Sequence, residues 1–97
     1  MQDVVAIEGR VTIDNSSEMR RRLAIALKAK PAEMAIDMSR VSYIEMSGLA
    51  TLVEAFRIAR QQGTRLSLTG IQGQTRYLLE VTHLDQFFDI VAQEQNA

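Results

Sequence analysis

Residues 34–69 most constrain the fold, because two short apolar segments flank one amphipathic segment there. Residues 34–38 and 66–69 are typical of buried strands. Between them, apolar side chains recur at helical spacing from Leu49 to Ala59, and Gly63 suits the position just after a helix end. This order predicts a strand–helix–strand unit whose strands are parallel and joined by a right-handed crossover.

The segment before this unit adds strands and a helix. Residues 4–7 and 10–13 are expected to form two strands joined as a hairpin at Glu8-Gly9. Asn15 stands three residues before Glu18, the spacing of a capping box, and it is expected to begin a helix. Pro31 prevents that helix from continuing.

The segment after the unit predicts a helix over 73–82, a further turn over 84–88 and a short edge strand over 89–91. The 97 residues suit a single domain, 1–97. We therefore expect an α/β fold: a mixed β-sheet of four to five strands with three to four helices packed mainly on one side.

Composition excludes several classes of function. Cysteine is absent and there is one histidine, His83, which rules out disulfides and multi-histidine metal sites within one chain. A formal net charge of −1 does not favour nucleic-acid binding, and no apolar run approaches the length of a membrane span. We expect a cytoplasmic protein that needs no cofactor or metal, has no catalytic residues and does not insert directly into membranes.

Polar residues gather between the strand at 34–38 and the helix that follows it. In parallel sheets, the surface beyond the carboxyl ends of the strands commonly binds ligands. Ser47 is open to two interpretations here. It caps the helix while Gly48 allows close packing on the sheet, or it lies in an anion or phosphorylation site at the helix N-terminus.

The stretch IDMSRVSYIEMSGLA at 36–50 resembles the signature of the STAS domain family, found in anti-sigma factor antagonists and sulfate transporter tails. The family pattern runs roughly hDhSxVxxhDSSGLxxLh, where h is apolar. Residues 8–11, 63–70 and 81–88 resemble further segments of the family, so the resemblance covers nearly the whole chain. It implies a free-standing STAS protein of the anti-sigma factor antagonist type.

The resemblance implies a partner switch in bacterial transcription regulation. The unmodified antagonist binds an anti-sigma factor that is also a GHKL-type serine kinase, and phosphorylation of a serine on the antagonist breaks the complex. The expected partner-binding residues are Asp14, Asn15, Ser39, Arg40, Ser42, Tyr43, Glu45, Met46, Ser47, Gly48, Leu49 and Thr51.

This chain departs from the family pattern at the acceptor serine, where it has Met46. Three explanations stay open: an antagonist without the usual off-switch, Ser47 as substitute acceptor, or a STAS branch that never used phosphorylation. The last corresponds to the alternative function, a small cytosolic subunit of a lipid-transporting ABC complex that docks on its ATPase.

Overall fold

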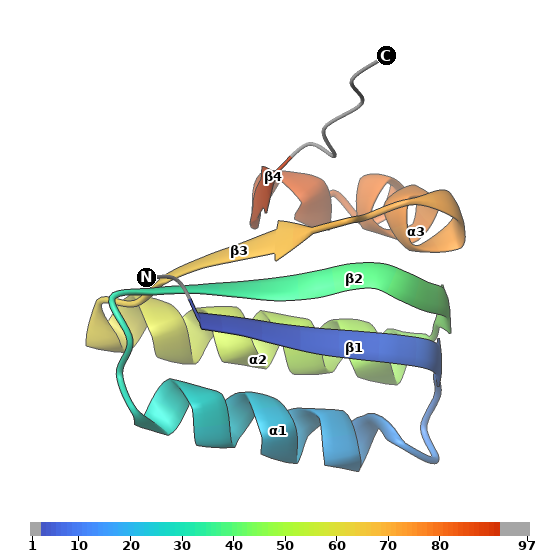
Figure 1. The fold of residues 1–97 in the computed structure, drawn as a ribbon. Helices are drawn as coiled ribbons and strands as arrows, with labels where there is room; N and C mark the ends of the chain where they lie inside the picture. Colours follow the sequence, from blue (N-terminus) through green and yellow to red (C-terminus); the bar gives the residue numbers. More distant parts are fainter. Residues whose placement is uncertain (1–2, 92–97) are drawn as a thin grey trace.

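A four-stranded parallel sheet forms the centre of the computed structural model, which describes residues 3–91 (Figure 1). Its three pairs of neighbouring strands are all parallel. The expected α/β class is therefore observed, but the expected mixed sheet is wrong for the described residues. The strands, in their order across the sheet, are β1 (Asp3–Val11), β2 (Glu33–Ile44), β3 (Arg65–Thr69) and β4 (Asp89–Val91).

The predicted hairpin at Glu8-Gly9 is wrong because β1 runs straight through these residues. Gly9 has a φ of +80°, a conformation that glycine adopts easily in a turn or in a bulge. Here the register with β2 shifts between Ala6 and Glu8 and again between Gly9 and Arg10. The glycine therefore serves an irregular strand, and both halves of β1 pair with the long strand β2.

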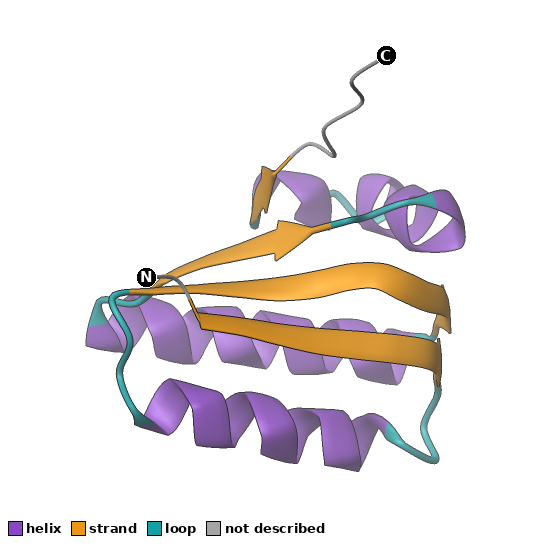
Figure 2. Ribbon diagram, in the orientation of Figure 1, coloured by secondary structure: helices purple, strands orange, loops and turns teal. Residues whose placement is uncertain are grey.

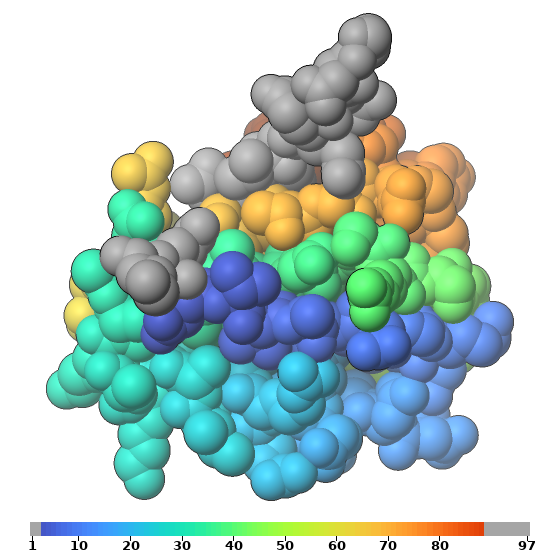
Figure 3. All heavy atoms as spheres, viewed as in Figure 1, coloured from blue at the N-terminus to red at the C-terminus, as the bar shows by residue number. Residues whose placement is uncertain are grey.

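Two helices lie side by side on one face of the sheet (Figures 1 and 2). The first, α1 (Ser16–Lys28), buries Met19, Leu23 and Leu27, as its apolar spacing predicts. The second, α2 (Met46–Gln62), connects β2 to β3 and ends at Gly63, whose φ of +81° confirms the predicted helix end. Figure 3 shows the outer strand β1 and the helix α1 as neighbours on one side of the molecule.

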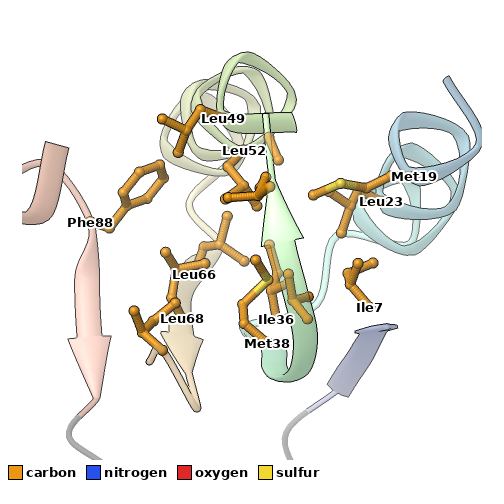
Figure 4. Packing of buried hydrophobic residues seen from close by; sticks show 14 of the residues in the cluster. Ile7, Met19, Leu23, Ile36, Met38, Leu49, Leu52, Leu66, Leu68 and Phe88 are labelled. Carbon is orange, nitrogen blue, oxygen red and sulfur yellow. The ribbon is translucent and has the colours of Figure 1, made fainter. Parts of the chain in front are cut away.

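The core lies between the sheet and these two helices (Figure 4). Alternate residues of β2, namely Met34, Ile36 and Met38, are at most 1% exposed. Leu23 of α1 and Leu52 of α2 belong to the same apolar cluster. Burial of these large side chains is the main stabilising contribution to the fold, at about 1.5–3 kcal/mol each.

The last part of the described chain follows the expected order of elements. A helix α3 (Gly73–Val81), a short 3₁₀ helix η1 (Leu84–Gln86) and the strand β4 come in turn. The rings of Phe56, Phe87 and Phe88 lie 4.7–5.5 Å apart between centroids and attach this segment to α2. None of the helices within residues 3–91 is long and apolar enough to cross a bilayer.

Candidate functional site

The predicted site lies where β1 and β2 end and α2 begins. Val11 and Ile44 are register partners at these two strand ends. The strand expected at 34–38 is longer in the structure, because β2 continues to Ile44 and only Glu45 separates it from α2. The polar residues from Ser39 to Tyr43 therefore stand on a strand, and only the residues around Glu45 and Met46 form the junction itself.

Glu45 joins the two strand ends through its backbone and its side chain. Its backbone N–H donates to the carbonyl oxygen of Val11 at 2.9 Å. Its carboxylate Oε1 accepts the backbone N–H of Ile13 at 3.2 Å. These contacts hold the turn between β1 and α1 beside the first residue of α2, although 32 positions separate Ile13 from Glu45.

Asn15 does not form the predicted capping box. Its Oδ1 accepts the N–H of Thr12 at 2.8 Å, and its Nδ2 donates to the carbonyl oxygen of Arg10 at 2.8 Å. Glu18 instead pairs with Arg21 at 2.8 Å. The capping box is therefore wrong, because the Asn15 side chain closes the end of β1. Asn15 still occupies the N-cap position of α1, as expected, and its backbone carbonyl accepts the N–H groups of Glu18 and Met19. The exposed neighbour Asp14 lies in the same turn.

At the start of α2, the side chain of Met46 is exposed whereas the hydroxyl of Ser47 is buried. Met46, the first residue of the helix, is 60% exposed. The Ser47 hydroxyl is buried and has no hydrogen-bond partner within the described part of the chain. Glu45 occupies the N-cap position, so the prediction that Ser47 caps the helix is wrong. A hydroxyl without access to solvent is also out of reach of a kinase in this conformation.

Gly48 fits the predicted close contact between α2 and the sheet. A Cβ atom at this position would lie 2.6 Å from Ile44 Cγ1 and 2.8 Å from Val11 Cγ1. Leu49 and Thr51 are 1% and 2% exposed. These three residues therefore pack the start of α2 against the strand ends, and they are buried in the isolated chain.

The remaining predicted residues continue along β2. Ser39 is half-buried, whereas Arg40 and Ser42 are exposed. The Ser39 backbone N–H bonds to the Asp37 carboxylate at 2.9 Å. This bond first, then the Ser39 side chain and the Arg40 charge, lowers the pKa of Asp37 below its ordinary 3.8, while burial acts in the opposite direction.

Tyr43, near the end of β2, is half-buried and interacts with the guanidinium of Arg10 near the end of β1. The Arg10 Cζ atom lies 4.6 Å from the centre of the Tyr43 ring, within the range of a cation–π interaction. Arg10 and Tyr43 are also register partners on β1 and β2. Tyr43 therefore lies on β2 just before the junction and contacts Arg10 of β1 there.

Gln74 of α3 supports this site and was not predicted. Its Oε1 accepts the N–H of Ile44 at 2.9 Å, and its Nε2 donates to the Ile44 carbonyl oxygen at 2.9 Å. The side-chain amide thus pairs with the end of β2 as another strand would. Nothing in the sequence marks the contact, since 30 positions separate Gln74 from Ile44.

An apolar groove extends from Met46 along α2. Its volume is about 500 Å³, and Ala50, Val53 and Leu84 line it together with Met46. Ile13, whose backbone N–H bonds the Glu45 carboxylate, is 74% exposed. We call this set the α2-start surface. It consists of Ile13, Glu45, Met46, Ala50, Val53, Glu54, Arg57 and Leu84, and the buried Leu49 lines the groove beneath them.

The α2-start surface has the features of a protein-binding surface. Two large apolar side chains, Ile13 and Met46, are exposed around one carboxylate, and exposed apolar patches commonly mark protein interaction sites. Within residues 3–91, no group of three or more His, Cys, Asp or Glu side chains is arranged to hold a metal ion.

Comparison with known proteins places this geometry in a family. The model of the family described as "Mlab, STAS domain" matches residues 1–92. The anti-sigma-B factor antagonist of Bacillus subtilis (strain 168) is 28% identical over 91 residues, covering 94% of this chain and 83% of the relative.

Similar solved structures include an anti-sigma factor antagonist from Mycobacterium paratuberculosis. It superposes with a TM-score of 0.84 at 19% identity, covering 92% of this chain and 75% of that one. The antagonist SpoIIAA in its unphosphorylated form gives a TM-score of 0.79 at 14% identity, covering 98% and 82%. At these identities the likeness concerns the fold. Together with the family match over nearly its whole length, it shows that this chain belongs to the STAS domain family, among relatives that are anti-sigma factor antagonists.

Proposed function

We propose that this protein is a cytoplasmic anti-sigma factor antagonist that binds its partner through the α2-start surface. The observation that carries the proposal is Met46, which is 60% exposed at the first residue of α2, where the family pattern has its acceptor serine. Relatives named as antagonists support the class of function. The proposed partner is an anti-sigma factor that is a serine kinase of the GHKL type.

The physical basis of binding is burial of an apolar patch with a polar border. Ile13 and Met46 supply exposed apolar area, and the groove along α2 offers a place for apolar partner side chains. Glu54 and Arg57 lie at the same groove and provide charges for orientation. The hydrogen bonds of Glu45 to Val11 and Ile13 fix this surface before the partner arrives, which lowers the entropy lost on binding.

We further propose that the partner switch lacks the usual phosphorylation step. Methionine has no hydroxyl to accept a phosphoryl group, and the Ser47 hydroxyl is buried. A phosphate at this position would add about 1.5–2 negative charges beside the carboxylate of Glu45. A chain with Met46 therefore remains competent to bind until its partner is removed in another way.

The test combines partner recovery with one substitution. The tagged protein is purified from its native cytosol, and the proteins that accompany it are identified by mass spectrometry. Met46→Asp then places a charge where the phosphate would sit, and we expect it to abolish binding of the recovered partner, measured by calorimetry. Tyr77→Asp on α3 is the matched control, since Tyr77 is 65% exposed and lies outside the α2-start surface.

The outcomes separate the proposed function from its alternative. Recovery of a serine kinase or sigma regulator that Met46→Asp no longer binds supports the proposal. Recovery of an ABC ATPase with its permease would instead assign the chain to a lipid transporter. Unchanged affinity of Met46→Asp for the recovered partner would show that the α2-start surface is not the interface.

A further inference from the structure

Charge is divided unevenly between the two helices on the sheet and the rest of the molecule. Within α1 and α2 there are six lysines and arginines but only two acidic residues. The rest of the chain has five basic and ten acidic residues. A protein with a net charge of −1 thus has one positively charged layer, and such a distribution orients a molecule toward a negatively charged partner.

The positive side chains lie on the side of α1 that faces away from the sheet. Met19, Leu23 and Leu27 are buried against the core. Helical spacing then directs Arg21, Ile25 and Lys28 outward, and all three are exposed.

The neighbouring helix α2 continues this positive layer. A salt bridge of 3.2 Å between Arg20 and Glu54 connects the two helices, and Arg57 of α2 is exposed as well. We call this surface the outer helix face; it consists of Arg20, Arg21, Ile25, Lys28, Glu54 and Arg57.

Ile25 is the unusual member of the outer helix face. Its side chain is 60% exposed, and it stands between the cations Arg21 and Lys28 on the same side of α1. Of these two cations, only Arg21 has an acidic partner within the described residues. It pairs with Glu18, and because both side chains are exposed this salt bridge contributes little stability. Helices that bind a membrane interface combine basic side chains, which attract anionic headgroups, with apolar side chains that enter the headgroup region. Ile25 and its basic neighbours provide both kinds of side chain on the outer helix face.

We propose that the outer helix face binds the surface of anionic lipid bilayers, with Ile25 entering the headgroup region and the basic side chains contacting lipid phosphates. Two helices lying side by side present a broad face to a plane. Each lysine or arginine near such a surface contributes about fivefold in affinity. The exposed isoleucine favours a lipid surface over a nucleic acid, where it would face phosphates without an apolar partner. This surface adsorption does not depend on the proposed antagonist function, although Glu54 and Arg57 belong to both the outer helix face and the α2-start surface.

A single tryptophan can report the contact directly, since the chain contains none. We expect the fluorescence of an Ile25→Trp variant to shift to the blue when vesicles of equal parts phosphatidylglycerol and phosphatidylcholine are added. No shift is expected with vesicles of phosphatidylcholine alone, or in 1 M salt, where the Debye length is only about 3 Å. Val4→Trp is the matched control, because Val4 is 61% exposed but lies on β1.

Substitutions in the unlabelled chain test the role of charge by vesicle sedimentation. Arg21→Gln with Lys28→Gln removes two positive charges from α1 and leaves the groove along α2 unchanged. We expect this pair to weaken binding at least about tenfold. Arg10→Gln with Arg40→Gln makes the same change in net charge on the sheet, and it is expected to leave binding within about twofold.

Four results would overturn the proposal: no binding to anionic vesicles, equal binding to neutral ones, equal losses from the two charge pairs, or a blue shift from Val4→Trp. Binding of the unlabelled chain to a DNA duplex with no binding to anionic vesicles would assign the face to nucleic acid instead. Circular dichroism of each variant checks that the fold is retained. If the double variant misfolds, Lys28→Gln alone, at an exposed side chain, provides the same test with one charge removed.

Discussion

The first turns of α1 and α2 look alike in sequence but differ in how firmly the fold holds them. Both helices follow the carboxyl end of a strand, and each has a serine at its second position. The third residue of α1, Glu18, is exposed, whereas the third residue of α2, Gly48, is buried between Ile44 and Val11.

This difference shows which turn can serve as a fixed binding surface. The start of α2 cannot move without disturbing the core, so Met46 is held in one position relative to Ile13. The start of α1 depends on local hydrogen bonds at the surface. We therefore expect equal substitutions at the two turns to have unequal effects on the free energy of unfolding.

The largest contrast is expected between Gly48→Ala and Glu18→Ala. Helix propensity alone would make Gly48→Ala stabilising by about 1 kcal/mol. The new Cβ would lie 2.6 Å from Ile44 Cγ1, inside a packed core, and overpacking of this kind costs about 1–3 kcal/mol. We expect a net loss for Gly48→Ala and a change within about 0.5 kcal/mol for Glu18→Ala, measured by urea unfolding.

Circular dichroism of the folded Gly48→Ala variant serves as the control for a change in helix content. If Gly48→Ala raised the unfolding midpoint, the close contact between α2 and the strand ends would be contradicted. The comparison between the two turns would then fail, because both would tolerate a side chain at the third position.

A smaller loss is expected for Asn15→Ala in the turn before α1. Asn15 makes two bonds of 2.8 Å, to the backbones of Thr12 and Arg10, and each typical hydrogen bond contributes about 0.5–1.5 kcal/mol. Because the turn is exposed and water replaces part of this loss, we expect destabilisation of about 1 kcal/mol. Hydrogen exchange should show faster opening of Thr12 with little change in the core of α2.

Asn15→Asp separates the acceptor role from the donor role in this turn. Aspartate retains the bond from the Thr12 N–H but loses the donor to the Arg10 carbonyl. A variant as unstable as Asn15→Ala would indicate that the donated bond matters most. Full stability in Asn15→Ala would contradict the assignment of this side chain to the end of β1.

The features that the sequence predicted well are those that depend on local spacing. Burial of Met19, Leu23 and Leu27 follows from the helical period, and the end of α2 at Gly63 follows from the conformational freedom of glycine. The hairpin was wrong because a glycine at positive φ serves equally well in a turn or in an irregular strand, and Gly9 does the latter.

The parts of the site that were missed depend on distant contacts. Glu45 reaches Ile13 and Gln74 reaches Ile44 across 32 and 30 positions, so no local pattern marks these partners. The two capping predictions failed for other reasons. The Ser47 hydroxyl is buried and has no hydrogen-bond partner in the described structure. The Asn15 side chain bonds the backbones of Thr12 and Arg10 instead, because a residue type suited to capping can also bond other nearby backbone groups.

The smallest expected effect, and the one opposite in sign, comes from Ser47→Ala. If Ser47 capped α2, its loss would cost about 1 kcal/mol. The hydroxyl is instead buried without a partner in the described structure, so alanine removes an unsatisfied polar atom and also has the better helix propensity. We expect stability unchanged or raised by up to about 1 kcal/mol in urea unfolding. Ser16→Ala, at the half-buried first residue of α1, is the matched control. A loss of stability confined to Ser47→Ala would restore the capping interpretation, and the two helix starts would then be more alike than their packing indicates.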